Sequence, residues 1–435
     1  MNTSDLQAVI GQFKKPALVA GAIGLALWLL GGVLALAHIG GETFSLDTFF
    51  AAYQVAFLFW FGITGGSLSL LMVHHVTGGG WGFIIRRQLE AATRLIPFMA
   101  IAFLPIAITA LMGENSLFWW AKPSNFDDHI LMAGQGRYLN VPFFLVRWVI
   151  YFVSFFLIAR FLNQGSLKQD QQKDDTVYER LSNFSSVGLL LFVLLMTFAI
   201  VDLVMSLTPH WYSSIIGLLF VAAQGLSTFA LMHVLVSRLG RDTDALKAVP
   251  NGYFRDLGNL TLAFVLLWAY GSFSQFLITY SGNTAEEAEW YRQRMSNGWQ
   301  FVGTALVLAH FFFPLIVLIV NSGMKRNPHR LARMGYYILF MRFVDLVWWI
   351  APTFHVSVVS FLPAIWIYIG AFVGLGGVWL SLWSAQMLVH LKDRPLLPAF
   401  DPRLGKAWTF EREGSMHDSS TRKTAQTDGS EVQNV

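Results

Sequence analysis

The stretch Val201-Asp202-Leu203-Val204 occurs a second time in the chain, as Val344-Asp345-Leu346-Val347. In each copy an aspartate lies inside an apolar run, and a proline, Pro209 or Pro352, follows seven residues later. Because proline has no N–H to donate and crowds the preceding turn, each copy predicts the last turns of a membrane helix. A carboxylate in hydrocarbon costs roughly 3 kcal/mol on insertion scales, so each aspartate is a candidate functional group. The alternative is a structural pair with a neighbouring arginine.

The composition indicates an all-α integral membrane protein. Of the 435 residues, 55% are hydrophobic and only 13% are charged, whereas a soluble domain carries about 25% charged residues. The formal charge of +4 therefore gives no indication of nucleic-acid binding. The chain has no cysteine, which excludes disulfides, thiolate-bound iron–sulfur clusters and covalently attached c-type haem from it. We identify no metal-ligating residues.

Ten apolar runs are long enough to cross about 30 Å of hydrocarbon as helices. They are roughly 17–38, 50–75, 93–112, 141–162, 184–206, 212–236, 257–280, 299–321, 333–351 and 363–389. Pro97 and Pro105 interrupt the third run and Pro314 interrupts the eighth, which membrane helices tolerate when neighbours satisfy the freed carbonyls. The runs define a membrane domain at 17–390, between an N-terminal segment at 1–16 and a C-terminal segment at 391–435 that is predicted to be partly disordered.

Positive charges gather in alternate connections between the runs. The N-terminus, the even-numbered connections and the C-terminal segment carry Lys14, Lys15, Arg86, Arg87, Arg94, Arg160, Lys168, Lys173, Arg180, Arg238, Arg241, Lys247, Arg255, Lys325, Arg326, Arg330, Arg333, Lys392 and Arg394. The odd-numbered connections carry only Lys122, Arg137, Arg292 and Arg294. Because cytoplasmic loops are enriched in Lys and Arg, both termini are predicted to be cytoplasmic, in a bacterial inner membrane.

A second match supports an internal repeat. Gly66 in the second run precedes His74 by eight residues, and Gly225 in the sixth run precedes His233 by the same number. The two aspartates lie in runs five and nine, so both matches have an offset of four runs, which predicts a parallel repeat. Runs two to five, about 50–206, and runs six to nine, about 212–351, are therefore predicted to form two four-helix bundles. Runs one and ten flank them.

Polar groups recur at matching depths in the two predicted bundles. Arg147 and Asp202 lie toward the outer side of consecutive runs, and consecutive helices usually neighbour each other. Arg342 and Asp345 are three residues apart on one helix face, and His310 lies near the middle of the preceding run. Chains of Asp, Glu and His inside a membrane are typical of proton relays, so we predict that these residues form a proton path.

His74, His75 and His233 lie at the inner ends of their runs. We include them in the predicted path because the pKa of histidine lies near working pH. The alternative for each is a buried or interfacial ring with a structural role. A bis-histidine haem needs two rings at matching depth; His74 and His233 match but lie near the membrane edge, and His310 has no partner in mid-membrane. We therefore expect no haem in this chain.

One long segment resembles a known family. It reads Met205-Ser206-Leu207-Thr208-Pro209-His210-Trp211-Tyr212-Ser213-Ser214-Ile215, then Gly217-Leu218-Leu219 and Gln224-Gly225-Leu226-Ser227. It is similar to the quinone-binding subunit 2 of alternative complex III, a quinol:cytochrome c oxidoreductase, and to the related NrfD-like membrane subunit of polysulfide reductase. The resemblance covers about 17–390 and implies two four-helix bundles with two flanking helices.

The resemblance also implies a function. Electrons would pass from quinol to iron–sulfur and multi-haem c-type subunits in other chains, beside a paralogous NrfD-like membrane subunit, with proton conduction through half-channels. The chain is thus expected to be a non-haem subunit with no redox centre of its own. His210 and Trp211 are candidate quinone-binding residues, since an aromatic wall and a hydrogen-bond partner suit a quinone head group. Lipid and quinone are the expected ligands. The alternatives are a secondary transporter and a purely structural anchor for periplasmic redox subunits.

Overall fold

A computed structural model describes residues 3–132, 135–171, 175–241, 249, 251–355, 357–392, 394, 396 and 401. Every regular element among these residues is a helix, and nine helical segments are long and apolar enough to cross a membrane. One of these segments, Trp299–Val320, consists of three consecutive short helices. A tenth crossing is obtained if the bent pair Gly80–Thr93 and Ile96–Ala110 counts as one. For the described part of the chain, the predicted all-α fold with several membrane-spanning helices is confirmed.

The helices follow the predicted runs and extend beyond most of them. The long helices are α1 (Thr3–Leu36), α2 (Leu46–Thr77), α3 (Gly80–Thr93), α7 (Val141–Gln171), α8 (Asp175–Leu203), α9 (Ile216–Arg241), α10 (Asn251–Gly282), α15 (Pro328–Phe354) and α17 (Ile365–His390). The short helices are α4 (Ile96–Ala102), α5 (Leu104–Ala110), α6 (His129–Met132), α11 (Ala285–Arg294), α12 (Trp299–Ala305), the π-helix η8 (Leu306–Phe312), α13 (Phe313–Val320), α14 (Ser322–Lys325) and α16 (Val358–Phe361). Single 3-10 turns are η1 (Gly41–Phe44), η2 (Gly113–Asn115), η3 (Trp119–Ala121), η4 (Pro123–Asn125), η5 (Gln135–Arg137), η6 (Met205–Leu207) and η9 (Leu362–Ala364). The first helix begins at Thr3, inside the predicted N-terminal segment, and most of the predicted segment 391–435 lies outside the described residues.

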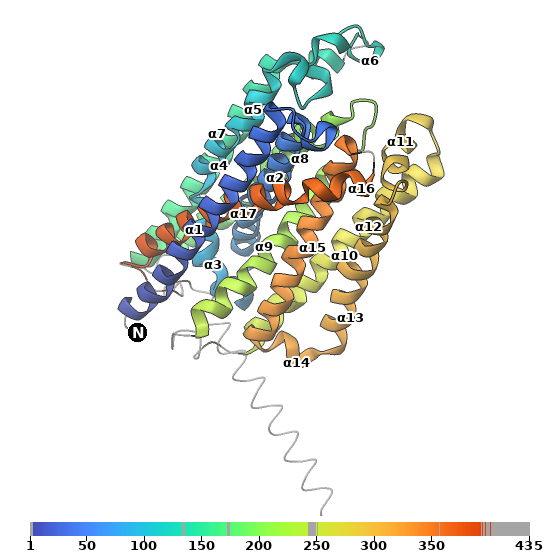
Figure 1. The fold of residues 1–435 in the computed structure, drawn as a ribbon. Coiled ribbons are helices and arrows are strands. Elements are labelled where there is room, and N and C mark those ends of the chain that lie inside the picture. Colours follow the sequence, from blue (N-terminus) through green and yellow to red (C-terminus); the bar gives the residue numbers. More distant parts are fainter. Residues whose placement is uncertain are drawn as a thin grey trace, which may run out of the picture.

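The helices α2 and α9 form the centre of the molecule, and the other long helices surround them (Figure 1). The most apolar part of α2 is 100% buried and that of α9 is 94% buried, whereas the corresponding parts of α1 and α10 are only 28% buried. The peripheral helices therefore present apolar side chains outward, as expected of surfaces in contact with lipid. We call the two ends of the bundle the α11 end and the α14 end; α1 begins at the α14 end (Figure 1).

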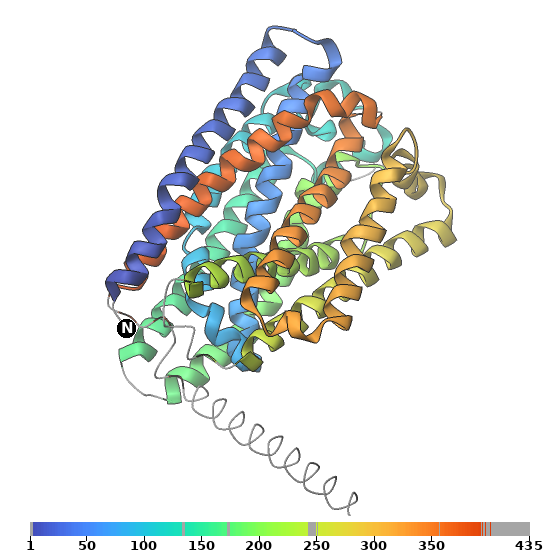
Figure 2. The same cartoon turned by 60° about the horizontal axis from the view of Figure 1, so that its bottom comes forward.

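The first and last long helices, α1 and α17, lie side by side along one flank (Figure 2). Glycines make this close approach sterically feasible: a Cβ atom at Gly24 would lie 2.3 Å from the backbone nitrogen of Gly374. A Cβ atom at Gly377 would likewise lie 2.4 Å from the Cα atom of Gly21. Small residues let helix backbones pack closely where lipid surrounds both helices. The predicted flanking runs one and ten therefore pack against each other.

The connection after the second run differs from the prediction. Arg86 and Arg87, read as charges of a cytoplasmic loop, belong to the buried helix α3 and are at most 1% exposed. The third run, predicted as one span at 93–112, is divided, because Pro97 and Pro105 lie in the first turns of the separate helices α4 and α5. Counting positive charges along the sequence did not reveal that these two arginines have buried acidic partners.

Those partners form an ionic network at the α14 end. The Glu90 carboxylate accepts from Arg86 Nε at 3.1 Å and from Arg87 Nη1 at 2.9 Å. Arg86 also donates to Asp401 at 2.9 Å, and Arg87 donates to Asp170 at 2.5 Å. Buried charges are tolerated when they are paired and hydrogen-bonded in this way. The network joins α3 to α7 and to the chain that follows α17.

The two aspartate copies end their helices differently. The helix α8 ends at Leu203, directly after Asp202 and before Pro209. Pro352 instead lies inside α15, which continues to Phe354. Because Pro352 has no N–H, the carbonyl of Trp348, four residues earlier, has no donor within the helix.

The eighth run is also interrupted. It consists of α12, η8 and α13, which together cover Trp299–Val320. Pro314 provides no N–H for the carbonyl of His310 and crowds it, and the wider π turn accommodates this conflict. His310 therefore lies on a π-helix rather than on a regular α-helix.

Candidate functional site

Arg147 and Asp202 form a bidentate ion pair between α7 and α8. Arg147 Nε and Nη2 donate to the two carboxylate oxygens of Asp202 at 3.0 and 2.8 Å. Tyr151 Oη donates to the same carboxylate at 3.0 Å, and Arg147 Nη1 donates to the carbonyl of Tyr138 at 2.7 Å. Asp202 is fully buried. The two residues thus meet as the sequence predicted, and the pair links two helices.

Arg342 and Asp345 also pair, within one turn of α15. Arg342 Nη1 donates to Asp345 Oδ2, and Trp268 Nε1 on α10 donates to the same oxygen at 3.1 Å. Arg342 Nε donates to Ser227 Oγ on α9 at 3.3 Å. Both charged side chains are almost fully buried. The spacing of three residues on one helix face produces this pair without help from a second helix.

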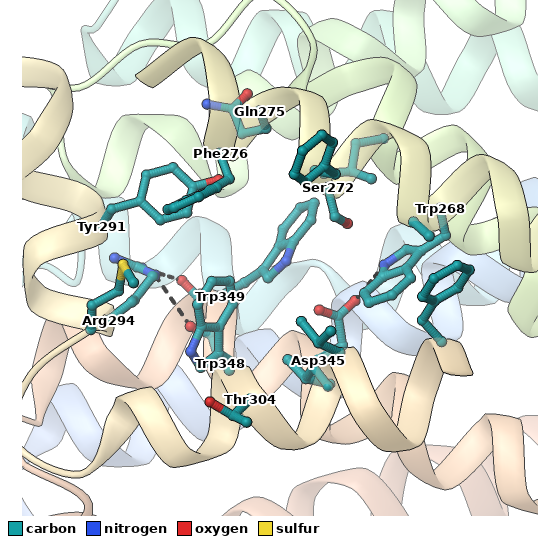
Figure 3. A pocket seen from close by; sticks show the side chains of 18 of the residues that line it. Trp268, Ser272, Gln275, Phe276, Tyr291, Arg294, Thr304, Asp345, Trp348 and Trp349 are labelled. Atoms are coloured by element: carbon teal, nitrogen blue, oxygen red, sulfur yellow. Dashed lines mark hydrogen bonds between the residues drawn. The ribbon is translucent and has the colours of Figure 1, made fainter. Parts of the chain in front are cut away.

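Asp345, unlike Asp202, lines a large cavity. The cavity has a volume of about 470 Å³, and its walls come mainly from α10, α11, α12, η8 and α15 (Figure 3). Its aromatic lining residues are Trp211, Trp268, Phe273, Phe276, Trp290, Tyr291, Phe311, Phe312, Trp348 and Trp349. Figure 3 shows Asp345 and Trp268 on one side of the cavity and Tyr291 and Arg294 on the other. A mostly apolar pocket with a few polar groups is typical of a small-molecule site.

The exposed part of the cavity lining is mostly apolar, with Thr304 as an exposed polar residue. Phe273 on α10 and Val307 and Phe312 on η8 line the cavity and are 60%, 51% and 44% exposed. Asp345 and Trp349 line it but are at most 4% exposed. Phe273, Val307 and Phe312 belong to helices that qualify as membrane spans, so we infer that the cavity opens sideways toward lipid.

Arg294 closes the cavity on the side opposite Asp345. Its guanidinium donates to the carbonyls of Trp348, Trp349 and Trp290 at 3.2, 2.5 and 3.0 Å. It also lies 3.7 Å from the centroid of the Trp290 ring, a cation–π contact. All of these partners are neutral. Burial lowers the pKa of the guanidinium, and Tyr291 partly offsets this effect.

His310 lies beside the cavity rather than in its lining. Its ring meets the Trp268 ring edge to face, with 4.3 Å between centroids. The imidazole is fully buried, and neither nitrogen has a hydrogen-bond partner among the described residues. Trp268 thus contacts both Asp345 and His310. An unsatisfied buried group on a π-helix combines two features that recur at functional sites.

The three other predicted histidines lie toward the α14 end of α2 and α9, and none lines the cavity. His75 Nδ1 is 3.2 Å from Ser185 Oγ, and His233 Nε2 is 2.7 Å from Thr261 Oγ1. His74 contacts the rings of neighbouring aromatic residues. The structure therefore brings Arg147 to Asp202 and His310 close to Asp345, while the three histidines stay apart from both pairs. Within the described ranges, no group of three or more His, Asp or Glu side chains is placed to hold a metal ion.

The predicted quinone-binding pair is split between two places. Trp211 lines the cavity and stacks on Trp290, with 4.6 Å between ring centroids. His210 lies outside the lining, where it contacts Trp119, and its Nε2 is 3.8 Å from a carboxylate oxygen of Asp128. Only Trp211 of this pair is placed to touch a ligand in the cavity.

No family model matches the sequence, and no curated protein matches it. Sequence reasoning missed Trp268 and treated Arg294 only as a charge in an outer connection. A signal for Arg294 was present, because Trp290 and Arg294 are four residues apart and so share one face of a helix. No comparable pattern marked Trp268, which reaches Asp345 only because α10 and α15 both pack against α9.

Proposed function

We propose that this chain is a non-haem membrane subunit of a quinol-oxidising respiratory complex of the alternative complex III type, and that the cavity beside Asp345 binds the quinol. The observation that carries this proposal is a mostly apolar, sideways opening that leads to a buried carboxylate. A quinol combines a long apolar tail with an aromatic head group that bears two hydroxyls. A water-soluble solute would require a polar opening, so the cavity favours a quinol over the substrate of a secondary transporter.

We also propose the finer arrangement that the sequence predicts. The two repeats at about 50–206 and 212–351 form parallel four-helix bundles, and both termini are cytoplasmic in a bacterial inner membrane. Within this division α8 packs on α2, and α10 and α15 pack on α9; the two bundles would meet where α2 packs on α9, α8 on α9 and α15 on α2. In this orientation the α11 end faces the periplasm. There the iron–sulfur and multi-haem c-type subunits would bind, beside a paralogous NrfD-like subunit.

The proposed chemistry assigns the protons to this chain and the electrons to its partners. Oxidation of a quinol to a quinone releases two protons and two electrons. Asp345 accepts a hydrogen bond from one quinol hydroxyl and takes up its proton, while Arg342 and Trp268 hold the carboxylate in place. His310, behind Trp268, is the next buried titratable group. Asp202, Arg147, His74, His75 and His233 remain predicted members of the path.

Substitution of Asp345 tests the site. In the purified complex, Asp345→Asn keeps the size of the side chain and removes the proton acceptor. We expect quinol affinity and the rate of quinol oxidation to fall about 10- to 100-fold, as for a lost hydrogen bond to a charged group. Quinol affinity can be followed by quenching of tryptophan fluorescence during quinol titration without electron acceptor, and oxidation by quinol absorbance.

Asp202→Asn is the matched control, because it makes the same change in the other arginine pair and lies outside the cavity lining. Its quinol affinity should equal that of the unmodified complex. Unchanged affinity in Asp345→Asn, or an equal loss in both variants, would refute the cavity as the quinol site.

A further inference from the structure

The helix α11 covers one side of the cavity, opposite Asp345 (Figure 3). Trp290, Tyr291 and Arg294 face the cavity as lining residues. Glu286 and Arg292 belong to the same helix and are exposed. One face of α11 therefore contacts the ligand space, while another carries charges into water. A short helix with these two faces separates the cavity from the aqueous phase at the α11 end.

Both connections of α11 contain left-handed backbone. Before the helix, Asn283 has a φ of 46°; after it, Asn297 and Gly298 have φ values of 52° and 93°. Such residues turn the chain sharply within one or two positions, and hinges use a few residues of this kind to absorb large backbone changes. The helix is thus attached to α10 and α12 by two short turns, without continuous helix on either side.

Arg294 provides the polar link between α11 and α15. The carbonyl of Trp348 lacks a helical donor because of Pro352, and Arg294 Nε supplies one at 3.2 Å. Arg294 Nη2 donates to the carbonyl of Trp349 at 2.5 Å and to Thr353 Oγ1 at 3.3 Å. The same guanidinium therefore satisfies a defect in α15 and holds α11 in place.

We propose that α11 is a hinged lid on the cavity and that Arg294 is the positioning residue that holds the lid closed. With the lid closed, the cavity communicates with lipid past Phe273 and Val307, and bulk water does not reach Asp345. With the bonds of Arg294 broken, the cavity opens to the aqueous phase. This inference rests on the cavity and the hinges alone, and it holds whatever ligand the cavity takes.

A single-cysteine reporter can test the lid, because the natural chain has no cysteine. Ser272→Cys places a thiol in the cavity wall, and Glu286→Cys places one on the exposed face of α11. Each variant is treated, in membranes opened to both sides, with a charged thiosulfonate and with an uncharged, lipid-soluble maleimide. We expect the maleimide to modify both thiols, and the thiosulfonate to modify the Ser272→Cys variant about tenfold or more slower than the Glu286→Cys variant.

Removal of the Arg294 bonds should then admit the charged reagent. In the Ser272→Cys background, Arg294→Gln should raise the thiosulfonate rate about tenfold, and Arg294→Lys should give a smaller increase, since lysine keeps the charge but loses the planar fork. Arg292→Gln is the matched control on the same helix: its side chain is 77% exposed and pairs with Glu289, so the rate should not change. The maleimide rate should be equal in all variants, which shows that the cavity itself is intact.

Two results would overturn the lid. One is equal thiosulfonate rates at positions 272 and 286 in the otherwise natural chain, a measurement that requires no change at Arg294. The other is an unchanged rate in both Arg294 variants. Neither measurement involves quinone, so the labelling pattern and the Asp345→Asn result are independent of each other.

Discussion

Two carboxylates in the same short sequence pattern have different surroundings. Arg147 approaches Asp202 from another helix and uses a planar fork to bind both carboxylate oxygens. Arg342 approaches Asp345 from the preceding turn of the same helix, so this pair does not join two helices. The first pair therefore contributes to the assembly of α7 and α8, whereas the second places a charge at the wall of a cavity.

Loss of Arg147 should destabilise the fold more than loss of the whole pair. Arg147→Gln leaves the buried carboxylate of Asp202 without its counterion, which costs about 3–5 kcal/mol for a pair of this kind. The double variant Arg147→Gln/Asp202→Asn removes both charges and should recover part of that loss. Thermal unfolding of the detergent-solubilised protein measures the effect, and equal Tm values for the single and double variants would contradict it.

Among the elements, the pair α1 and α17 depends most directly on glycine. The backbones approach so closely at Gly24 that a methyl group would overlap the backbone of Gly374. Overpacking of a tight contact typically costs about 1–3 kcal/mol. By contrast, a Cβ atom at Gly11, in the same helix, would meet nothing within 4 Å.

Gly24→Ala should therefore lower the Tm and weaken the association of α1 with the rest of the protein. Gly11→Ala makes the same chemical change at an open position, where alanine favours a helix over glycine by about 0.5–1 kcal/mol. Its Tm should stay the same or rise slightly. Thermal unfolding of both variants provides the comparison, and a similar decrease in both would show that backbone contact at Gly24 is unimportant.

For the molecule as a whole, the number of crossings depends on the bent pair α3 to α5. If these helices together cross the membrane, Thr77 before them and Asn115 after them lie on opposite sides. The exposed cations Lys168, in the last turn of α7, and Arg326, directly after α14, are typical of a cytoplasmic side, so we predict that Thr77 faces the cytoplasm.

Single cysteines at these two exposed positions should react from different sides. In intact cells, a membrane-impermeant maleimide should label Asn115→Cys and leave Thr77→Cys unmodified until the membrane is opened. Labelling of both from outside, or of neither, would mean that the α3–α5 region enters and leaves on one side. The protein would then have nine crossings, and its termini would lie on opposite sides.

Local patterns in the sequence predicted most of the long helices and the proximity of each arginine to its aspartate, with ion pairing as the alternative interpretation. Hydrophobic length identifies a span, and the spacing of Arg342 and Asp345 brings them onto one face of a helix. The burial of α3 could not be predicted in this way, because Arg86 finds one of its partners, Asp401, 315 residues later. The cavity could not be predicted either, since its lining residues come from six helices. The position of Arg294 depends on a carbonyl 54 residues away that Pro352 leaves free.

The contact between α1 and α17 has a consequence for the synthesis and membrane insertion of the protein. At synthesis rates of about 5–20 residues per second, α17 leaves the ribosome roughly 18–70 seconds after α1. During that time the glycine face of α1 has only lipid beside it. Helix α1 must therefore insert into the membrane before α17 has been synthesised. Helix α17, the last long helix to be made, then packs against the glycine face of α1.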